Sequence, residues 1–191
     1  MKNIYFKFTK INEENEDTYL VSKIMGSPAF PTHFLENNHL EEMYFVMQLN
    51  LSELSCYDTL LPKEGMLYFF LDITSYPYEP LVIYTNEEIT TVYDNINEGF
   101  EEYGDISSYK LEFTQDKEDG HIILGDIDPS LDLDCEIDTT GYIMLLNIDS
   151  LMLPEKTLTL GNPDGWYIYL IKEEDLKKQD FSKVKFVDFG S

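Results

Sequence analysis

Apolar and polar positions alternate along much of the chain, and this alternation predicts strands. Near the N-terminus, Ile4, Phe6 and Phe8 share one side, while Lys7 and Thr9 lie on the other. A period of two residues is typical of a half-buried strand, so we predict a strand over residues 3–9. Similar segments predict further strands over residues 18–24, 43–50, 66–73, 81–85, 107–114, 121–124 and 184–187.

Three segments between these strands have other patterns. Residues 51–56 follow Asn50, whose side chain can accept from a helix amide, with Glu53 three positions later. This spacing predicts a short helical turn. Residues 172–179 have the spacing of a short amphipathic helix. Residues 32–42, rich in His and Glu, are predicted to form a polar loop.

One strand-turn-strand pattern occurs twice. Residues 45–54 can be aligned with residues 142–151, so that Asn50 meets Asn147 and both are predicted to cap a helical turn. Gly65 then meets Gly165, each before an apolar strand. The apolar runs indicate strands that are buried on both faces. We therefore predict an α+β fold that is predominantly antiparallel β, with an internal duplication and a few short helices.

The duplicated pattern also predicts the domain organisation. The length of 191 residues suits one domain, so residues 1–191 are interpreted as a single domain with halves of roughly 18–85 and 107–188. Residues 131–138 alternate between apolar side chains and carboxylates, which predicts a half-buried strand with an acidic outer face. A calcium site is the alternative there, but the carboxylates lack the spacing of a calcium loop.

Charge narrows the choice of partners. The formal net charge is −24 at pH 7, and every basic residue is a lysine. Nucleic-acid binding depends on neutralising phosphates, and anionic membranes attract basic surfaces, so both partners are disfavoured. A basic protein is the partner that the charge favours. The alternative interpretation is that acidity only keeps the protein soluble.

Candidate cofactor and metal ligands are sparse. Cys56 and Cys135 are far apart in the sequence and are predicted to be reduced and buried. His33 and His39 are separated by five intervening residues, a spacing that fits neither a helix face nor a zinc hairpin. We predict no cofactor, no metal and no catalytic residue. The sequence contains no continuous apolar leader or membrane span, so we predict a cytoplasmic protein.

Several blocks of the sequence resemble the YwqG-like family of bacterial proteins, a domain of unknown function. These blocks, in family order, are Ser22-Lys-Ile-x-Gly-x-Pro28, Gln48–Leu54, Leu61–Phe70, His121-x-x-Leu-Gly125, Leu145–Ser150, Asp164-Gly165 and a block from Lys172 to Ser182. The resemblance implies an α+β fold with internal duplication, and it carries over no catalytic residue, substrate or cofactor. A glycine-rich block of the family is shortened here to Leu124-Gly125-Asp126.

Two classes of function follow. The first is a non-enzymatic protein-binding module, such as an immunity or inhibitor protein against a basic toxin, in line with family relatives that occur near toxin genes. The second is a small-ligand-binding protein or a hydrolase that uses carboxylates, with His121, Asp126, Asp128 and Asp149 as candidates. No known nucleophile or metal motif supports a hydrolase. We predict a ligand or partner site in the loops that hold Gly26, Pro28, His121, Gly125, Asp126 and Asp128.

Overall fold

Antiparallel strands make up most of the chain. The computed structural model describes residues 2–94, 96–100, 107–116, 120–129, 131, 133, 138–154 and 165–190. The longer strands are β1 (Ile4–Lys10), β4 (Tyr44–Asn50), β5 (Met66–Asp72), β6 (Glu79–Thr85), β8 (Tyr109–Thr114), β9 (Ile122–Gly125), β10 (Tyr142–Asp149), β11 (Gly165–Lys172) and β12 (Lys185–Gly190). The two-residue strands are β2 (Lys23–Ile24), β3 (Ala29–Phe30) and β7 (Thr91–Val92).

The helices are short. Two are α-helices, α1 (His33–Asn38) and α2 (Glu173–Lys177), and the 3-10 helices are η1 (Leu40–Glu42), η2 (Leu51–Leu54), η5 (Ser150–Met152) and η6 (Phe181–Lys183). No helix among the described residues has the length and apolar character needed to cross a membrane.

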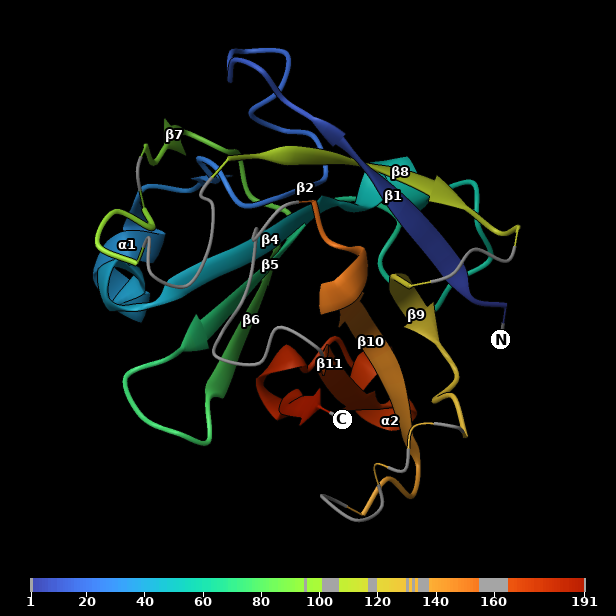
Figure 1. Cartoon of the computed structure of the whole chain (residues 1–191). Coiled ribbons are helices and arrows are strands. Elements are labelled where there is room, and N and C mark those ends of the chain that lie inside the picture. The colour runs from blue at the N-terminus through green and yellow to red at the C-terminus, as the bar shows by residue number, and fades with distance from the viewer. Residues whose placement is uncertain are drawn as a thin grey trace.

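Within the described residues, one ten-stranded sheet has the order β12-β11-β10-β9-β1-β8-β2-β4-β5-β6. The sheet curls until its edge strands β12 and β6 approach each other, and the ring of Tyr84 on β6 lies 6.0 Å from that of Phe181 on η6. In Figure 1, β4, β5 and β6 form one side, β9, β10 and β11 form the other, and β1 and β8 cross above them. The predicted antiparallel β character is confirmed.

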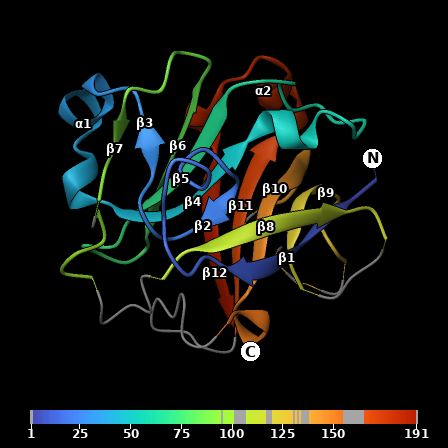
Figure 2. The same cartoon turned by 90° about the horizontal axis from the view of Figure 1, so that it is seen from above.

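Both faces of the central strands are buried, as their apolar runs predict. On β5, Phe69 joins the main core inside the curled sheet, whereas Tyr68 and Phe70 pack in a second cluster on the outside. Figure 2 shows α1, β3 and β7 together on the outer side of β4, β5 and β6, where they cover that second cluster. On β11, Tyr169 faces the main core and Ile168 faces a third cluster on the opposite side of the molecule.

The strand pairs on the two sides of the sheet correspond. Lys23 of β2 lies opposite Gln48 of β4, and Ile122 of β9 lies opposite Asn147 of β10 in the same way. Both β4 and β10 contain a bulge where they pair with the next strand. The two halves of the chain exchange one strand each. β1, from the N-terminal half, pairs with β9 of the C-terminal half, and β8, from the C-terminal half, pairs with β2 of the N-terminal half. The two sides are therefore interlocked through the central β1–β8 pair.

This correspondence corrects the predicted caps. Asn50 caps η2 as predicted, with its side chain accepting from the Ser52 amide at 3.1 Å. The residue that caps η5 is Asp149, which accepts from Leu151 at 3.0 Å. Asn147 lies inside β10 and donates to the Gly120 carbonyl at 3.4 Å. The predicted cap at Asn147 is wrong. In the structure Asn50 corresponds to Asp149, so the sequence alignment of residues 45–54 with residues 142–151 is displaced by two positions from the structural correspondence.

Two other segments differ from the prediction. Residues 33–38 form α1, where a polar loop is predicted, because the Phe34 ring packs 6.3 Å from the rings of both Phe30 and Tyr68. The predicted strand over 18–24 shortens to Lys23–Ile24. Most of the predicted acidic strand 131–138 lies outside the described residues, but Leu133 is buried.

Candidate functional site

The predicted site residues fall at two corresponding places rather than in one site. Gly26 and Pro28 follow β2, and His121, Gly125, Asp126 and Asp128 surround β9. Pro28 is buried, and its carbonyl accepts from the Tyr93 amide at 2.9 Å. Asp126 and Asp128 are exposed. The two groups therefore lie on different sides of the sheet and do not form one site.

His121 is a buried neutral histidine. Its Nδ1 accepts from the backbone amide of Asp149 at 3.2 Å, and its Nε2 lies 3.4 Å from the carbonyl oxygen of Met152, to which it can donate. The ring stacks on Phe6 and contacts Phe8 edge-on. Burial lowers the pKa of His121 to about 4, while the bond to Met152 opposes this shift. Both ring nitrogens are engaged, so His121 joins β9 to β10 rather than acting as a base.

Asp149 has a comparable structural role. Its carboxylate accepts from Leu151, whereas its contact with His121 is made through the backbone. The two residues therefore do not form the carboxylate–imidazole pair that a hydrolase would use to orient a base.

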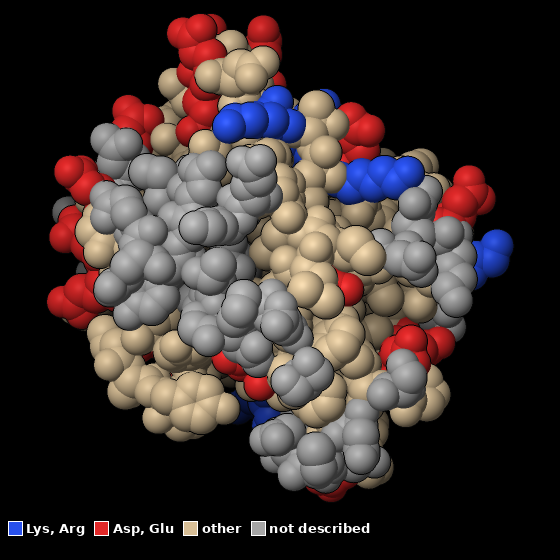
Figure 3. Space-filling model, in the orientation of Figure 1, with Lys and Arg blue, Asp and Glu red and all other residues tan. Residues whose placement is uncertain are grey.

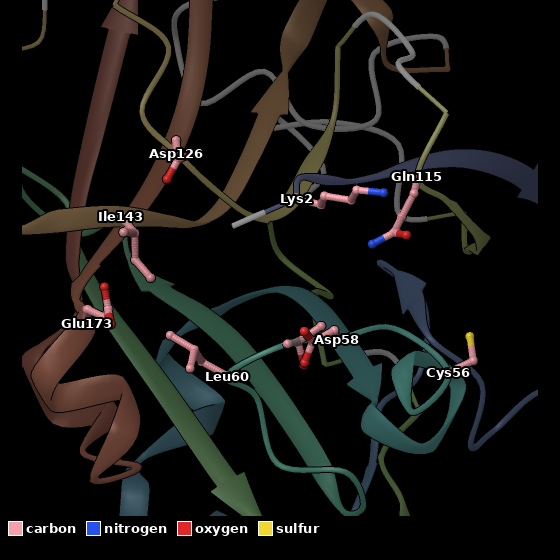
Figure 4. A pocket seen from close by; sticks show the side chains of 9 residues that line it. Lys2, Cys56, Asp58, Leu60, Gln115, Asp126, Ile143 and Glu173 are labelled. Atoms are coloured by element: carbon pink, nitrogen blue, oxygen red, sulfur yellow. The ribbon is translucent and has the colours of Figure 1, made fainter.

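A polar hollow of about 720 Å³ lies near Asp126. Figure 4 shows Asp126 and Ile143 on one side, with Lys2 and Gln115 across from them. The remaining lining residues are Cys56, Asp58, Thr59, Leu60 and Glu173. The lining includes three carboxylates and one ammonium group, so the hollow is electrostatically suited to a cation. It is open, because most of its charged lining residues are exposed.

Histidine and cysteine side chains do not gather at a metal centre in the described part of the chain. No group of three or more His, Cys, Asp or Glu side chains that could hold a metal ion is present among the described residues. Cys56 is a free, exposed cysteine, so its predicted burial is wrong. It follows η2, whose Leu51 and Leu54 take the buried positions instead. Cys135 lies outside the described residues.

A buried ion pair was not predicted from the sequence. Lys23, which is 0% exposed, bonds the carboxylate of Glu14. The Lys23 ammonium also lies 5.8 Å from the ring centre of Tyr19. Burial lowers the pKa of Lys23, and the hydrogen bond and charge of Glu14 work against that shift. A lysine directly before the apolar residues Ile24 and Met25, in a predicted strand, is the sequence signal that could have pointed to such a pair.

Acidic side chains are spread over the surface rather than confined to the hollow. In Figure 3 they stand out around the outline of the face shown, and several lie on the loop that projects at the top, between β1 and β2. Glu13, Glu16 and Asp17 are the exposed carboxylates of that loop.

Comparison with models of known protein families identifies the family of this chain. The family described as Domain of unknown function (DUF1963) matches residues 22–125, more than half of the chain. The chain belongs to the DUF1963 family. The DUF1963 match begins at Ser22, next to β2, and ends at Gly125, the last residue of β9. No curated protein matches the chain. The predicted membership of a family of unknown function is confirmed, while the YwqG-like name stays a prediction.

Proposed function

We propose that the protein is a non-enzymatic binding module for a basic protein, such as an inhibitor or immunity protein against a basic bacterial toxin, and that it acts in the cytoplasm. The observation that carries this proposal is the open hollow in which Asp58, Asp126 and Glu173 outnumber Lys2. A lysine or arginine side chain of the partner would enter it. The net charge of −24 would attract such a partner from a distance.

The state of the predicted catalytic candidates supports a binding role. His121 and Asp149 are used in joining strands and capping η5. The charged side chains that line the hollow are exposed, which suits a protruding group of a partner better than an enclosed substrate.

The alternative is a small-ligand-binding protein or a hydrolase that uses carboxylates in the same region. The hollow has a volume within the range of small-molecule sites, which favours this candidate. Saturable binding of a small cationic ligand, with no response to basic peptides, would support it over the proposed function.

We also propose that the two sides of the sheet arose by internal duplication. The matching bulges in β4 and β10 support this origin. Met25 and Leu124 also share a positive φ, 59° and 55°, which is uncommon for residues other than glycine.

The proposed function predicts an association rate that depends strongly on salt. A lysine-rich synthetic peptide is the probe, immobilised for biosensor measurements between about 20 and 200 mM NaCl. We expect the association rate constant to fall by about tenfold or more over this range, because screening removes long-range attraction. A neutral peptide of equal length is the control. Rates that do not change with salt would contradict the proposal.

A further inference from the structure

The carboxylate of Glu14 sits in a site built from residues 23–27. One oxygen pairs with the ammonium group of Lys23, and the other accepts from the backbone amide of Ser27 at 2.8 Å. The Lys23 side chain is 0% exposed and that of Glu14 is 19% exposed. A buried ammonium and a backbone donor that act on the same carboxylate are typical of an anion site.

Gly26 provides the space for this carboxylate. A Cβ atom at Gly26 would lie 2.8 and 2.9 Å from the two carboxylate oxygens of Glu14. The residue also has a φ of +74°, which residues with side chains rarely adopt. Glycine at this position therefore permits both the turn and the close approach of an anion.

The corresponding place on the other side of the sheet lacks these features. There the Asp126 amide donates to the neutral side chain of Asn3 at 3.3 Å, and Ile122 stands in the position of Lys23. A backbone amide at this position can therefore be satisfied by a neutral oxygen. At the Glu14 site, it is the ammonium group of Lys23 that favours an anion.

The site and its occupant belong to separate parts of the chain. Lys23, Gly26 and Ser27 lie within the residues that the DUF1963 model matches, whereas Glu14 precedes them. Glu14 comes from the loop between β1 and β2, and its neighbours Glu13 and Asn15 are exposed. Because Glu14 lies in a loop and not in a strand, its side chain can leave the site without breaking a strand pair.

We propose that Lys23, Gly26 and the Ser27 amide form a carboxylate-binding site, which Glu14 fills in the free protein and a carboxylate of another molecule fills when the loop moves away. Glu14 then acts as a built-in competitor. This inference does not depend on the basic partner proposed above.

The test uses the full chain with Glu14→Ala and acetate as the probe. Removing the carboxylate leaves the Lys23 ammonium buried without its main partner, so we expect Tm to fall by about 10 °C. Acetate should raise Tm saturably, relative to chloride at equal ionic strength. In the wild-type protein the acetate affinity should be at least about tenfold weaker, because the tethered Glu14 competes at a high effective concentration.

Two variants serve as controls. Glu16→Ala removes an exposed carboxylate from the same loop and should respond to acetate no more than the wild type. Glu14→Ala/Lys23→Met removes the ammonium and should lose the saturable response. If Glu14→Ala is unfolded without ligand, circular dichroism follows the folded fraction during the same titration, and recovery with acetate is the expected result.

The proposal is overturned if acetate and chloride act alike on Glu14→Ala, or if the double variant responds as strongly. Inorganic phosphate is the second probe. Stabilisation of Glu14→Ala by phosphate and not by acetate would overturn the assignment to carboxylates.

Discussion

His121 links the stability of the protein to pH. Its pKa is lowered from 6.5 to about 4 in the folded state. Between these values the unfolded chain takes up a proton that the folded chain does not, so stability falls as the pH falls. The full shift corresponds to about 3 kcal/mol.

Urea denaturation between pH 7 and pH 4 measures this loss of stability. The wild type should lose more stability over this range than His121→Asn, whose side chain does not titrate. His33→Gln is the control, since His33 is about half exposed, and it should follow the wild type. Equal pH dependence in His121→Asn and the wild type would show that His121 does not carry the effect.

Gly26 offers a second test at the scale of one residue. Gly26→Ala would place a methyl group against Ser108 and Glu14 at a φ of +74°. Gly141 has a φ of +78° with no atom within 4 Å of the added Cβ, so Gly141→Ala isolates the backbone cost. We expect Gly26→Ala to be less stable than Gly141→Ala by about 2 kcal/mol in urea denaturation. Equal losses would mean that the space at Gly26 is not restricted.

At the scale of the element, local pattern predicts the long strands well. Residues 44–50 and 66–72 carry apolar side chains toward both faces, so the sequence of each segment is enough to predict a buried strand. The helix α1 could not be predicted in this way. The Thr32 side chain makes no capping bond, and α1 depends on contacts of Phe34 with Phe30 and with Tyr68, of which Tyr68 is distant in sequence.

The candidate site was predictable only in part. Asp126 was predicted and lines the hollow, but Lys2, Asp58 and Glu173 meet it only through the curl of the sheet. The pairing of Lys23 with Glu14 depends on how the β1–β2 loop folds back, which the alternation of residues does not encode.

The pairing of β1 with β9 and of β8 with β2 predicts how the chain behaves when it is divided into two fragments. A fragment of residues 1–100 lacks β8, the partner of β2, and a fragment of residues 101–191 lacks β1, the partner of β9. We expect neither fragment to fold alone, because each leaves a buried strand edge unpaired. An equimolar mixture should form a 1:1 complex with the circular dichroism spectrum of the intact protein. A cooperative thermal transition in either isolated fragment would contradict this expectation.

At the scale of the whole molecule, charge and shape have separable roles. The net charge of −24 creates a field that attracts any basic molecule and gives little specificity. The hollow would add specificity if a basic side chain enters it, since Asp58, Asp126 and Glu173 all line it. A variant that changes the hollow must therefore be compared with one that changes the net charge equally elsewhere.

The most direct measurement is the Kd of a lysine-rich peptide, by titration calorimetry at a fixed salt concentration, for two triple variants. Asp58→Asn/Asp126→Asn/Glu173→Gln neutralises the hollow, and Glu41→Gln/Glu42→Gln/Glu88→Gln removes the same charge from exposed positions elsewhere. We predict that the first variant weakens binding by about tenfold or more and the second by about threefold or less. Equal weakening in both variants would contradict a binding site in the hollow.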